Sequence, residues 1–159
     1  MTRERFITML EKEQEGLIKF LLALCDGNYP EAEDLAQETS LKAYLSYRGY
    51  VERFKFSTWL YRIAYNSFID HKRKKSIPTE SLDSAAHIEG AVSSDRMQFE
   101  GLYSAIEVLP LNEKTAILLF YLEEMKIIDI AIVMRKPTGT VKSYLNRGRK
   151  HLKERLKDE

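Results

Sequence analysis

Residues 127–149 read IIDIAIVMRKPTGTVKSYLNRGR, and this stretch decides the fold that the sequence predicts. Apolar residues recur at helical spacing from Ile127 to Met134 and again after Thr138, with the break Arg-Lys-Pro between the two runs. The hydroxyl of Thr138 can accept a hydrogen bond from a free amide at a helix start, so we expect Thr138 to be the N-cap of the second helix. The pattern predicts a short helix, a tight turn and a long helix.

The two faces of the predicted long helix differ in character. One face carries apolar or small residues at intervals of four, three, four and four: Val141, Leu145, Gly148, Leu152 and Leu156. The other face begins with polar and basic residues: Thr140, Lys142, Ser143, Asn146, Arg147, Arg149 and Lys150. A helix-turn-helix has this arrangement, because the first turns of its second helix enter the DNA major groove while nearby cations meet phosphates. A helical hairpin with a solvated basic face is the alternative interpretation.

The distribution of charge favours the DNA-binding interpretation. The net charge is only +1, from 25 basic and 24 acidic residues, yet residues 134–157 contain nine basic residues against the single acid Glu154. Such a surface repels itself unless a polyanion is bound. Residues 76–95, SIPTESLDSAAHIEGAVSSD, are instead small and acidic without an apolar period, and they predict a flexible linker.

Apolar residues also recur at helical spacing on both sides of the linker. We therefore expect an all-α protein of two small helical domains, 1–75 and 96–159. In the first domain two apolar seams are separated by a turn at residues 26–30, and a third helix starts at Ser57 or Thr58 and ends near Arg73. The two seams consist of Leu17, Phe20, Leu21 and Leu24, and of Ala32, Leu35, Ala36, Thr39 and Ala43. In the second domain, Leu102, Ala105, Ile106 and Leu109 share a face, Pro110 ends that helix, and another runs from Asn112 to about Glu123.

Aromatic and basic residues alternate in residues 47–75, a mixture that suits single-stranded nucleic acid, because rings stack on bases and cations follow phosphates. Core packing competes for the same side chains, and we expect Phe56 and Trp59 to be core. The loop before that helix holds Tyr50, Arg53, Phe54 and Lys55, which we expect to face a ligand.

A third feature is the acidic helix EAEDLAQETSLKAY, residues 31–44. Opposite its apolar seam, helical spacing places together Asp34, Gln37, Glu38, Leu41 and Lys42. This face is either a solvated surface or a dock for a basic partner helix.

Enzymatic, metal-binding and secretory functions have little support in the sequence. Cys25 is the only cysteine, and His71, His87 and His151 lie in separate contexts, without an HExxH motif or a Gly-rich phosphate loop. We therefore expect no catalysis, no cofactor and no metal. The start, MTRERF, lacks a signal core, and no apolar run approaches the roughly 20 residues of a membrane span. We expect a cytoplasmic protein.

Several motifs together resemble the bacterial RNA polymerase sigma factors of the extracytoplasmic-function (ECF) class. They are DLAQE at 34–38, FSTWLYRIAYNSFIDHKRKK at 56–75, VLPLNEK at 108–114, DIA at 129–131 and PTGTVKSYLNRGRKHL at 137–152. Their order and spacing fit that class over nearly the whole chain.

The resemblance implies a role for each segment. Residues 1–75 would be sigma region 2, which binds the clamp coiled coil of the polymerase β′ subunit and melts the −10 element. Residues 96–159 would be region 4, which binds the β flap and reads the −35 element. The implied polymerase contacts are Asp34, Gln37, Glu38, Leu41 and Lys42. The implied contacts to single-stranded −10 DNA are Tyr50, Arg53, Phe54, Lys55, Arg62, Tyr65 and Asn66. The implied −35 contacts are Thr140, Lys142, Ser143, Asn146, Arg147, Arg149 and Lys150.

The partners that follow from the resemblance are core RNA polymerase, promoter DNA and an anti-sigma factor, with no small-molecule substrate. The alternative is a free-standing helix-turn-helix regulator whose N-terminal half senses a ligand or dimerises. Such a regulator binds duplex DNA alone, whereas a sigma factor requires core polymerase. A helical adaptor that binds no DNA would leave the basic final helix unexplained.

Overall fold

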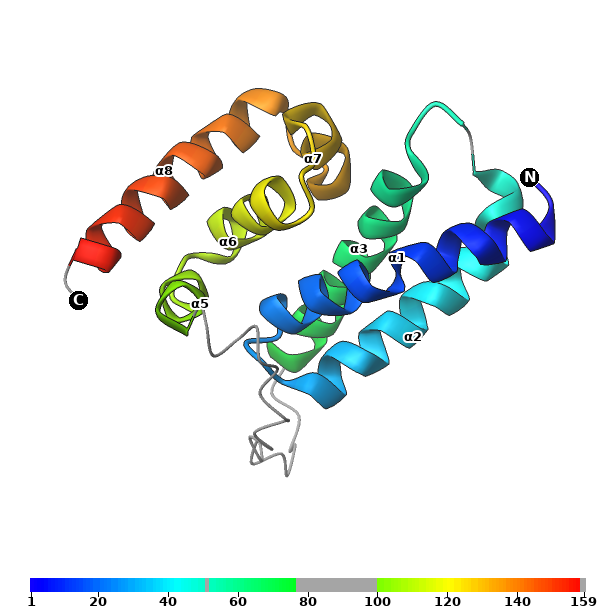
Figure 1. The fold of residues 1–159 in the computed structure, drawn as a ribbon, viewed down its shortest axis with the longest axis horizontal. Helices are drawn as coiled ribbons and strands as arrows, with labels where there is room; N and C mark the ends of the chain where they lie inside the picture. Colours follow the sequence, from blue (N-terminus) through cyan, green and yellow to red (C-terminus); the bar gives the residue numbers. More distant parts are fainter. Residues whose placement is uncertain (51, 77–99, 158–159) are drawn as a thin grey trace.

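The computed structural model describes residues 1–50, 52–76 and 100–157, and every regular element in those ranges is a helix (Figure 1). The all-α prediction is confirmed. Except for Ser76, the predicted linker 76–95 lies outside the described residues.

The first domain is built from three long helices. They are α1 (Arg3–Leu24), α2 (Tyr29–Ser46) and α3 (Phe56–Ser76), with a 3-10 turn, η1 (Tyr47–Gly49), after α2. The side chain of Thr2 accepts from the Arg5 amide (3.2 Å) and that of Asn28 from the Glu31 amide (3.1 Å), so both helix starts are capped. The apolar seams predicted for α1 and α2 are buried.

Two predicted boundaries in this domain differ from the structure. The turn after α1 is shorter, because Asp26 (φ 53°) and Gly27 (φ 86°) reverse the chain with left-handed backbone and α2 begins at Tyr29. The expected caps Ser57 and Thr58 are wrong, because the Trp59 amide already donates to the Lys55 carbonyl (3.1 Å) and α3 starts at Phe56.

The second domain contains α5 (Glu100–Glu107), α6 (Leu111–Ile117), α7 (Ile127–Met134) and α8 (Thr138–Lys157). The single helix expected from Asn112 to about Glu123 is instead α6 followed by a π-helical turn, η2 (Leu118–Leu122). Arg135, at φ 55°, reverses the chain between α7 and α8. The expected N-cap Thr138 is wrong by one position: α8 includes Thr138, and the Pro137 carbonyl accepts from the Val141 amide (3.1 Å).

The predicted core of the second domain is largely present. Ala105, Ile106 and Leu109 are buried, and α5 ends before Pro110 as expected. The side chain of Leu102 lies outside the described ones. On α8, Val141, Leu145 and Gly148 are buried, Leu152 is half-buried and Leu156 is 42% exposed, so the stripe leaves the core at its C-terminal end.

The two domains pack directly against each other. In Figure 1, α3 lies beside α7, and close backbone contacts also join α1 to α5, α6 and η2. Buried apolar residues of both domains form one continuous cluster. The two domains predicted from the sequence therefore share an apolar surface in this structure.

Gly148 gives the first prediction, because a Cβ there would lie 2.8 Å from Ile117 Cγ1, an atom close to the α6 backbone. We expect Gly148→Ala to destabilise the protein by about 1–2 kcal/mol, since overpacking outweighs the gain in helix propensity of about 1 kcal/mol. Gly139→Ala in the same helix meets nothing within 4 Å and serves as the matched control. Urea denaturation measures both, and equal stabilities of the two variants would contradict the close α6–α8 packing.

Candidate nucleic-acid interface

The polar face of α8 is presented to solvent. Its exposed side chains are Lys142, Ser143, Asn146, Arg147, Arg149 and Lys150, and Thr140 is half-buried. This face exists because the opposite face of α8 packs through Gly148 onto Ile117 of α6 and through its apolar stripe onto the core. The structure therefore brings all seven predicted residues of this helix to one side of the domain.

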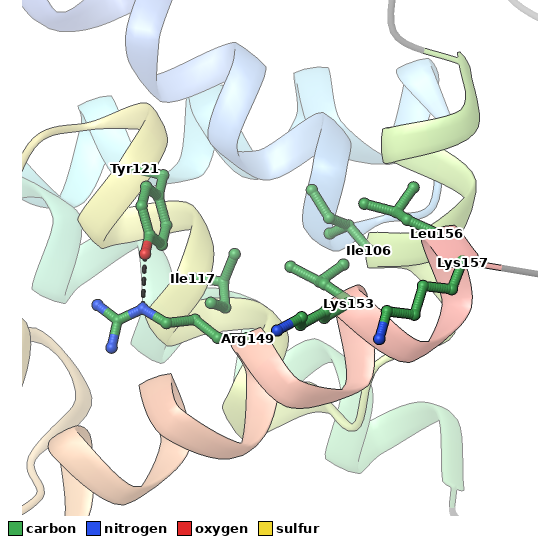
Figure 2. Close-up of a pocket in the computed structure, with 8 residues that line it drawn as sticks. Ile106, Ile117, Tyr121, Arg149, Lys153, Leu156 and Lys157 are labelled. Atoms are coloured by element: carbon green, nitrogen blue, oxygen red, sulfur yellow. Dashed lines mark hydrogen bonds between the residues drawn. The ribbon is translucent and has the colours of Figure 1, made fainter.

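Arg149 is held by aromatic residues that the sequence analysis did not single out. Its Nε donates to the Tyr121 hydroxyl (2.6 Å, Figure 2), and its guanidinium lies 5.3 Å from the Phe120 ring centroid and 5.6 Å from that of Tyr121. One further N–H group of Arg149 donates to Asn146 Oδ1 (3.3 Å). Arg149 therefore orients the Asn146 amide. Sequence periodicity could not reveal this contact, because the π-helical turn η2 sets the direction of Tyr121.

Arg147 is also held by its neighbours on α8. Its guanidinium lies 5.5 Å from the Tyr144 ring centroid, and its Nε donates to the Ser143 carbonyl (3.4 Å). A planar guanidinium with remaining N–H groups is suited to the paired acceptors of a guanine edge or to phosphate.

An apolar groove of about 590 Å³ runs beside α8 (Figure 2). Its floor is formed by apolar or aromatic residues of α5, α6, η2 and α8: Ile106, Ile117, Tyr121, Leu152 and Leu156. Cationic side chains on α8 line it too, namely Arg149, Lys153 and Lys157. At Leu156 the apolar stripe of α8 therefore continues past the core onto the surface.

The loop before α3 is anchored at one end and exposed at the other. Tyr50 is half-buried, with its ring centroid 5.3 Å from that of Trp59 and 5.9 Å from that of Phe56, and its hydroxyl donates to the Phe54 carbonyl. Arg53, Phe54 and Lys55 are exposed. Phe56 is buried and Trp59 half-buried, which agrees with their expected place in the core.

The candidate −10 residues on α3 are less exposed to solvent than Arg53, Phe54 and Lys55 of the loop. Tyr65 is 6% exposed, and Arg62 and Asn66 are half-buried. Burial raises the pKa of the Tyr65 hydroxyl, and Tyr144 on α8 adds to this shift from the other domain. The side chains at the loop tip are therefore exposed, whereas Tyr65 is buried on the side of α3 that faces the second domain.

The acidic face of α2 combines exposed and tethered side chains. Asp34, Gln37 and Leu41 are exposed, and Leu45, which the sequence analysis did not include, is 75% exposed beside them. Glu38 and Lys42 form an ion pair with each other, and each also contacts a side chain of α3.

Four polar side chains join α2 to α3, namely Glu38 and Lys42 on α2 and Ser67 and His71 on α3. Lys42 Nζ lies 2.9 Å from Glu38 Oε1 and donates to Ser67 Oγ (3.0 Å), and His71 Nε2 lies 2.7 Å from Glu38 Oε2. Burial opposes ionisation of Glu38, but hydrogen bonds from Lys42 and His71 outweigh it and lower the pKa of that carboxyl. Glu38 is therefore a charged link between α2 and α3 as well as part of the acidic face.

The described residues offer no group of three or more His, Cys, Asp or Glu side chains that would hold a metal ion. His71 and His151 each pair with a glutamate, the latter with Glu113 (2.6 Å), and His87 lies outside the described residues. None of the helices in the described ranges combines the length and apolar character of a membrane span.

Comparison with known proteins identifies relatives of both domains. Residues 9–77 match the family Sigma-70 region 2, and residues 99–152 match the family Sigma-70, region 4. The chain is 37% identical over 147 residues to the ECF RNA polymerase sigma factor SigW of Bacillus subtilis (strain 168), a match that covers 83% of this chain and 79% of SigW. It is 33% identical over 142 residues to SigM of the same organism, with 85% of each chain covered.

The fold as a whole also has a counterpart among solved structures. The sigma factor RpoE, solved in complex with the anti-sigma factor NepR from Bartonella quintana, superposes with a TM-score of 0.78 and 25% sequence identity. The superposition covers 97% of this chain and 98% of RpoE, so it extends over both domains.

Proposed function

This chain belongs to the ECF sigma factors of bacterial RNA polymerase, and from that premise we propose how its surfaces divide the work of promoter recognition. As an alternative sigma factor it binds core polymerase and promoter DNA and directs transcription initiation. The contrast between two exposed faces supports this division of polymerase binding and DNA binding. The face of α2 is acidic with exposed leucines, and the face of α8 is basic and polar.

We assign residues 1–75 to region 2 and residues 96–159 to region 4, joined by 76–95. The acidic face of α2 docks the clamp coiled coil of β′ through Asp34, Gln37, Glu38, Leu41 and Lys42. Leu41 and Leu45 add apolar area at this dock, since large exposed leucines on a charged helix mark an interaction site. The apolar groove beside α8 receives the β flap, because its apolar floor and cationic side chains fit an amphipathic segment.

The DNA contacts follow the exposed surfaces. Single-stranded −10 DNA meets Arg53, Phe54 and Lys55 at the loop tip, with Tyr50, Arg62, Tyr65 and Asn66 behind them. The −35 element meets the start of α8, where Asn146 and Arg147 read base edges and Lys142, Ser143 and Thr140 lie on the same face. Lys150 contacts phosphate, and Arg149 supports the Asn146 amide.

We propose that the chain carries no catalytic activity of its own, works in the cytoplasm beside polymerase and is held inactive by an anti-sigma factor. The last point rests on the similarity to RpoE, whose structure contains the anti-sigma factor NepR.

Run-off transcription with purified core polymerase and fragmented genomic DNA tests the proposed function. We expect discrete transcripts that depend on this chain. A free-standing regulator would instead bind duplex DNA alone as a dimer and leave core polymerase without new start sites, and that result would overturn the assignment.

Asp34 gives a test of the polymerase dock. Because a charge-assisted contact is worth about 1.5–3 kcal/mol, we expect Asp34→Lys to raise the Kd for core polymerase roughly tenfold or more. Glu38 is avoided in this test because reversing it would also break its contacts with Lys42 and His71. Glu11→Lys, on an exposed position of α1, is the matched charge reversal. An unchanged affinity of Asp34→Lys would show that α2 is not the dock.

The start of α8 gives a test of base reading. Alanine at Asn146 or Arg147 should cost about 1–3 kcal/mol and relax the preference at one or two −35 base pairs. Alanine at Lys150 should weaken binding to all sequences and lower the salt slope by about one ion, because a phosphate contact carries no sequence information. Holoenzyme affinities on −35 point variants at several salt concentrations distinguish the two classes; identical behaviour of the three variants would exclude base reading by α8.

A further inference from the structure

The hydroxyl of Tyr121 begins a chain of hydrogen bonds that ends on the polar face of α8. Tyr121 lies in η2, is 55% exposed and accepts a hydrogen bond from Arg149 Nε at 2.6 Å (Figure 2). Nη1 of the same guanidinium donates to Asn146 Oδ1 at 3.3 Å. The position of the Asn146 amide therefore depends on a tyrosine that the sequence places 25 residues earlier.

Aromatic rings hold the guanidinium that joins the two ends of this chain. The guanidinium carbon of Arg149 lies 5.3 Å from the Phe120 ring centroid and 5.6 Å from that of Tyr121. The two rings contact each other edge to face, with their centroids 4.9 Å apart. A planar cation that rests against rings and also donates to a hydroxyl is restricted in its rotamers. Arg149 is therefore oriented toward Asn146 in the free protein.

The π-helical geometry of η2 sets the direction of Tyr121. The Glu123 amide donates to the Leu118 carbonyl (3.2 Å), a pairing one residue longer than that of an α-helix. An α-helical continuation of α6 would advance by a larger angle per residue and would turn Tyr121 away from its observed direction. Single π-helical turns are rare and occur frequently at functional sites.

The hydrogen bond from Arg149 decides which end of the Asn146 amide is available to DNA. An amide has an acceptor oxygen and a donor NH2 group. Because Arg149 donates to Oδ1, the NH2 group is the end that is left to meet a base. In the major groove guanine, adenine and thymine each present an acceptor, whereas cytosine presents only its N4 donor. An amide held in this way disfavours cytosine, but a free amide can turn over and accept from it.

We propose that Tyr121 is a positioning residue for −35 recognition, which acts through Arg149 to hold the Asn146 amide as a hydrogen-bond donor and so selects against cytosine at the base that Asn146 reads. The inference rests on the proposed function, because that function places Asn146 on the −35 element. Tyr121 then determines specificity without contacting a base.

A single oxygen atom separates the informative variant from the wild type. Tyr121→Phe removes the hydroxyl but keeps the ring beside Arg149 and on the floor of the apolar groove. Tyr29→Phe, at an exposed tyrosine of α2, is the matched control. Asn146→Ala removes the group that reads the base, and the double variant with Tyr121→Phe tests whether the two residues act in series.

Holoenzyme affinities are measured on four promoters that differ only at the −35 base pair where Asn146→Ala relaxes the preference. We expect wild type and Tyr29→Phe to bind the cytosine promoter about tenfold more weakly than the best of the others, and Tyr121→Phe only about threefold more weakly. The double variant should match Asn146→Ala alone. Affinity of Tyr121→Phe for core polymerase should not change, because the groove keeps its ring. A merely structural defect would instead weaken all four promoters alike.

Nuclear magnetic resonance of the free protein tests the hydrogen-bond chain without DNA. The Nε proton of Arg149 should exchange slowly with water in the wild type and faster in Tyr121→Phe. The side-chain NH2 resonances of Asn146 should shift in the same variant and stay in place in Tyr29→Phe. Unchanged signals of Arg149 and Asn146 in Tyr121→Phe would contradict the chain.

Three binding results would also overturn the inference: a wild-type holoenzyme that accepts cytosine at the base pair read by Asn146, a Tyr121→Phe holoenzyme that rejects cytosine as strongly as wild type, or a double variant whose base preference differs from that of Asn146→Ala. Failure of the proposed function looks different. In that case the wild-type chain starts no transcription with core polymerase and shows no preference at any −35 base pair, and the inference fails with it.

Discussion

The apolar faces that α2 and α8 bury decide which of their polar side chains face solvent. The clearest case is α8, where Val141, Leu145 and Gly148 enter the core and thereby turn Asn146 and Arg147 to solvent. On α2, burial of Leu35 and Ala36 in the same way exposes Asp34. The acidic face of α2 and the basic face of α8 are therefore both defined by what the opposite side of each helix buries.

Several polar residues serve the fold and the surface at once. Glu38 lies on the acidic face, yet it also joins α2 to α3 through Lys42 and His71. Arg149 lies on the basic face of α8, yet its Nε donates to the Tyr121 hydroxyl and one of its remaining N–H groups donates to Asn146. Side chains held in this way lose less rotamer entropy when they bind, so a rigid, pre-oriented surface gains affinity over a flexible one.

The packing of α3 on α7 joins the two domains through one continuous apolar cluster. Apolar burial and the pair between Lys114 and Asp26 favour the packed arrangement. The pair joins a buried ammonium to a largely exposed carboxylate, so the desolvation of Lys114 offsets part of its attraction to Asp26.

Local spacing alone determined most of the helical layout. The seams of α1 and α2 and the polar face of α8 follow from residues three or four apart, which a helix places on one side. The turn between α7 and α8 follows from the break in that spacing at residues 135–137. Tertiary structure decided the rest: Asp26 meets Lys114 across 88 positions, Tyr65 is buried near Tyr144, and the turn η2 aims Tyr121 at Arg149. Contacts between distant segments leave no periodic trace in a sequence, because they depend on how whole helices pack and not on the spacing within any one of them.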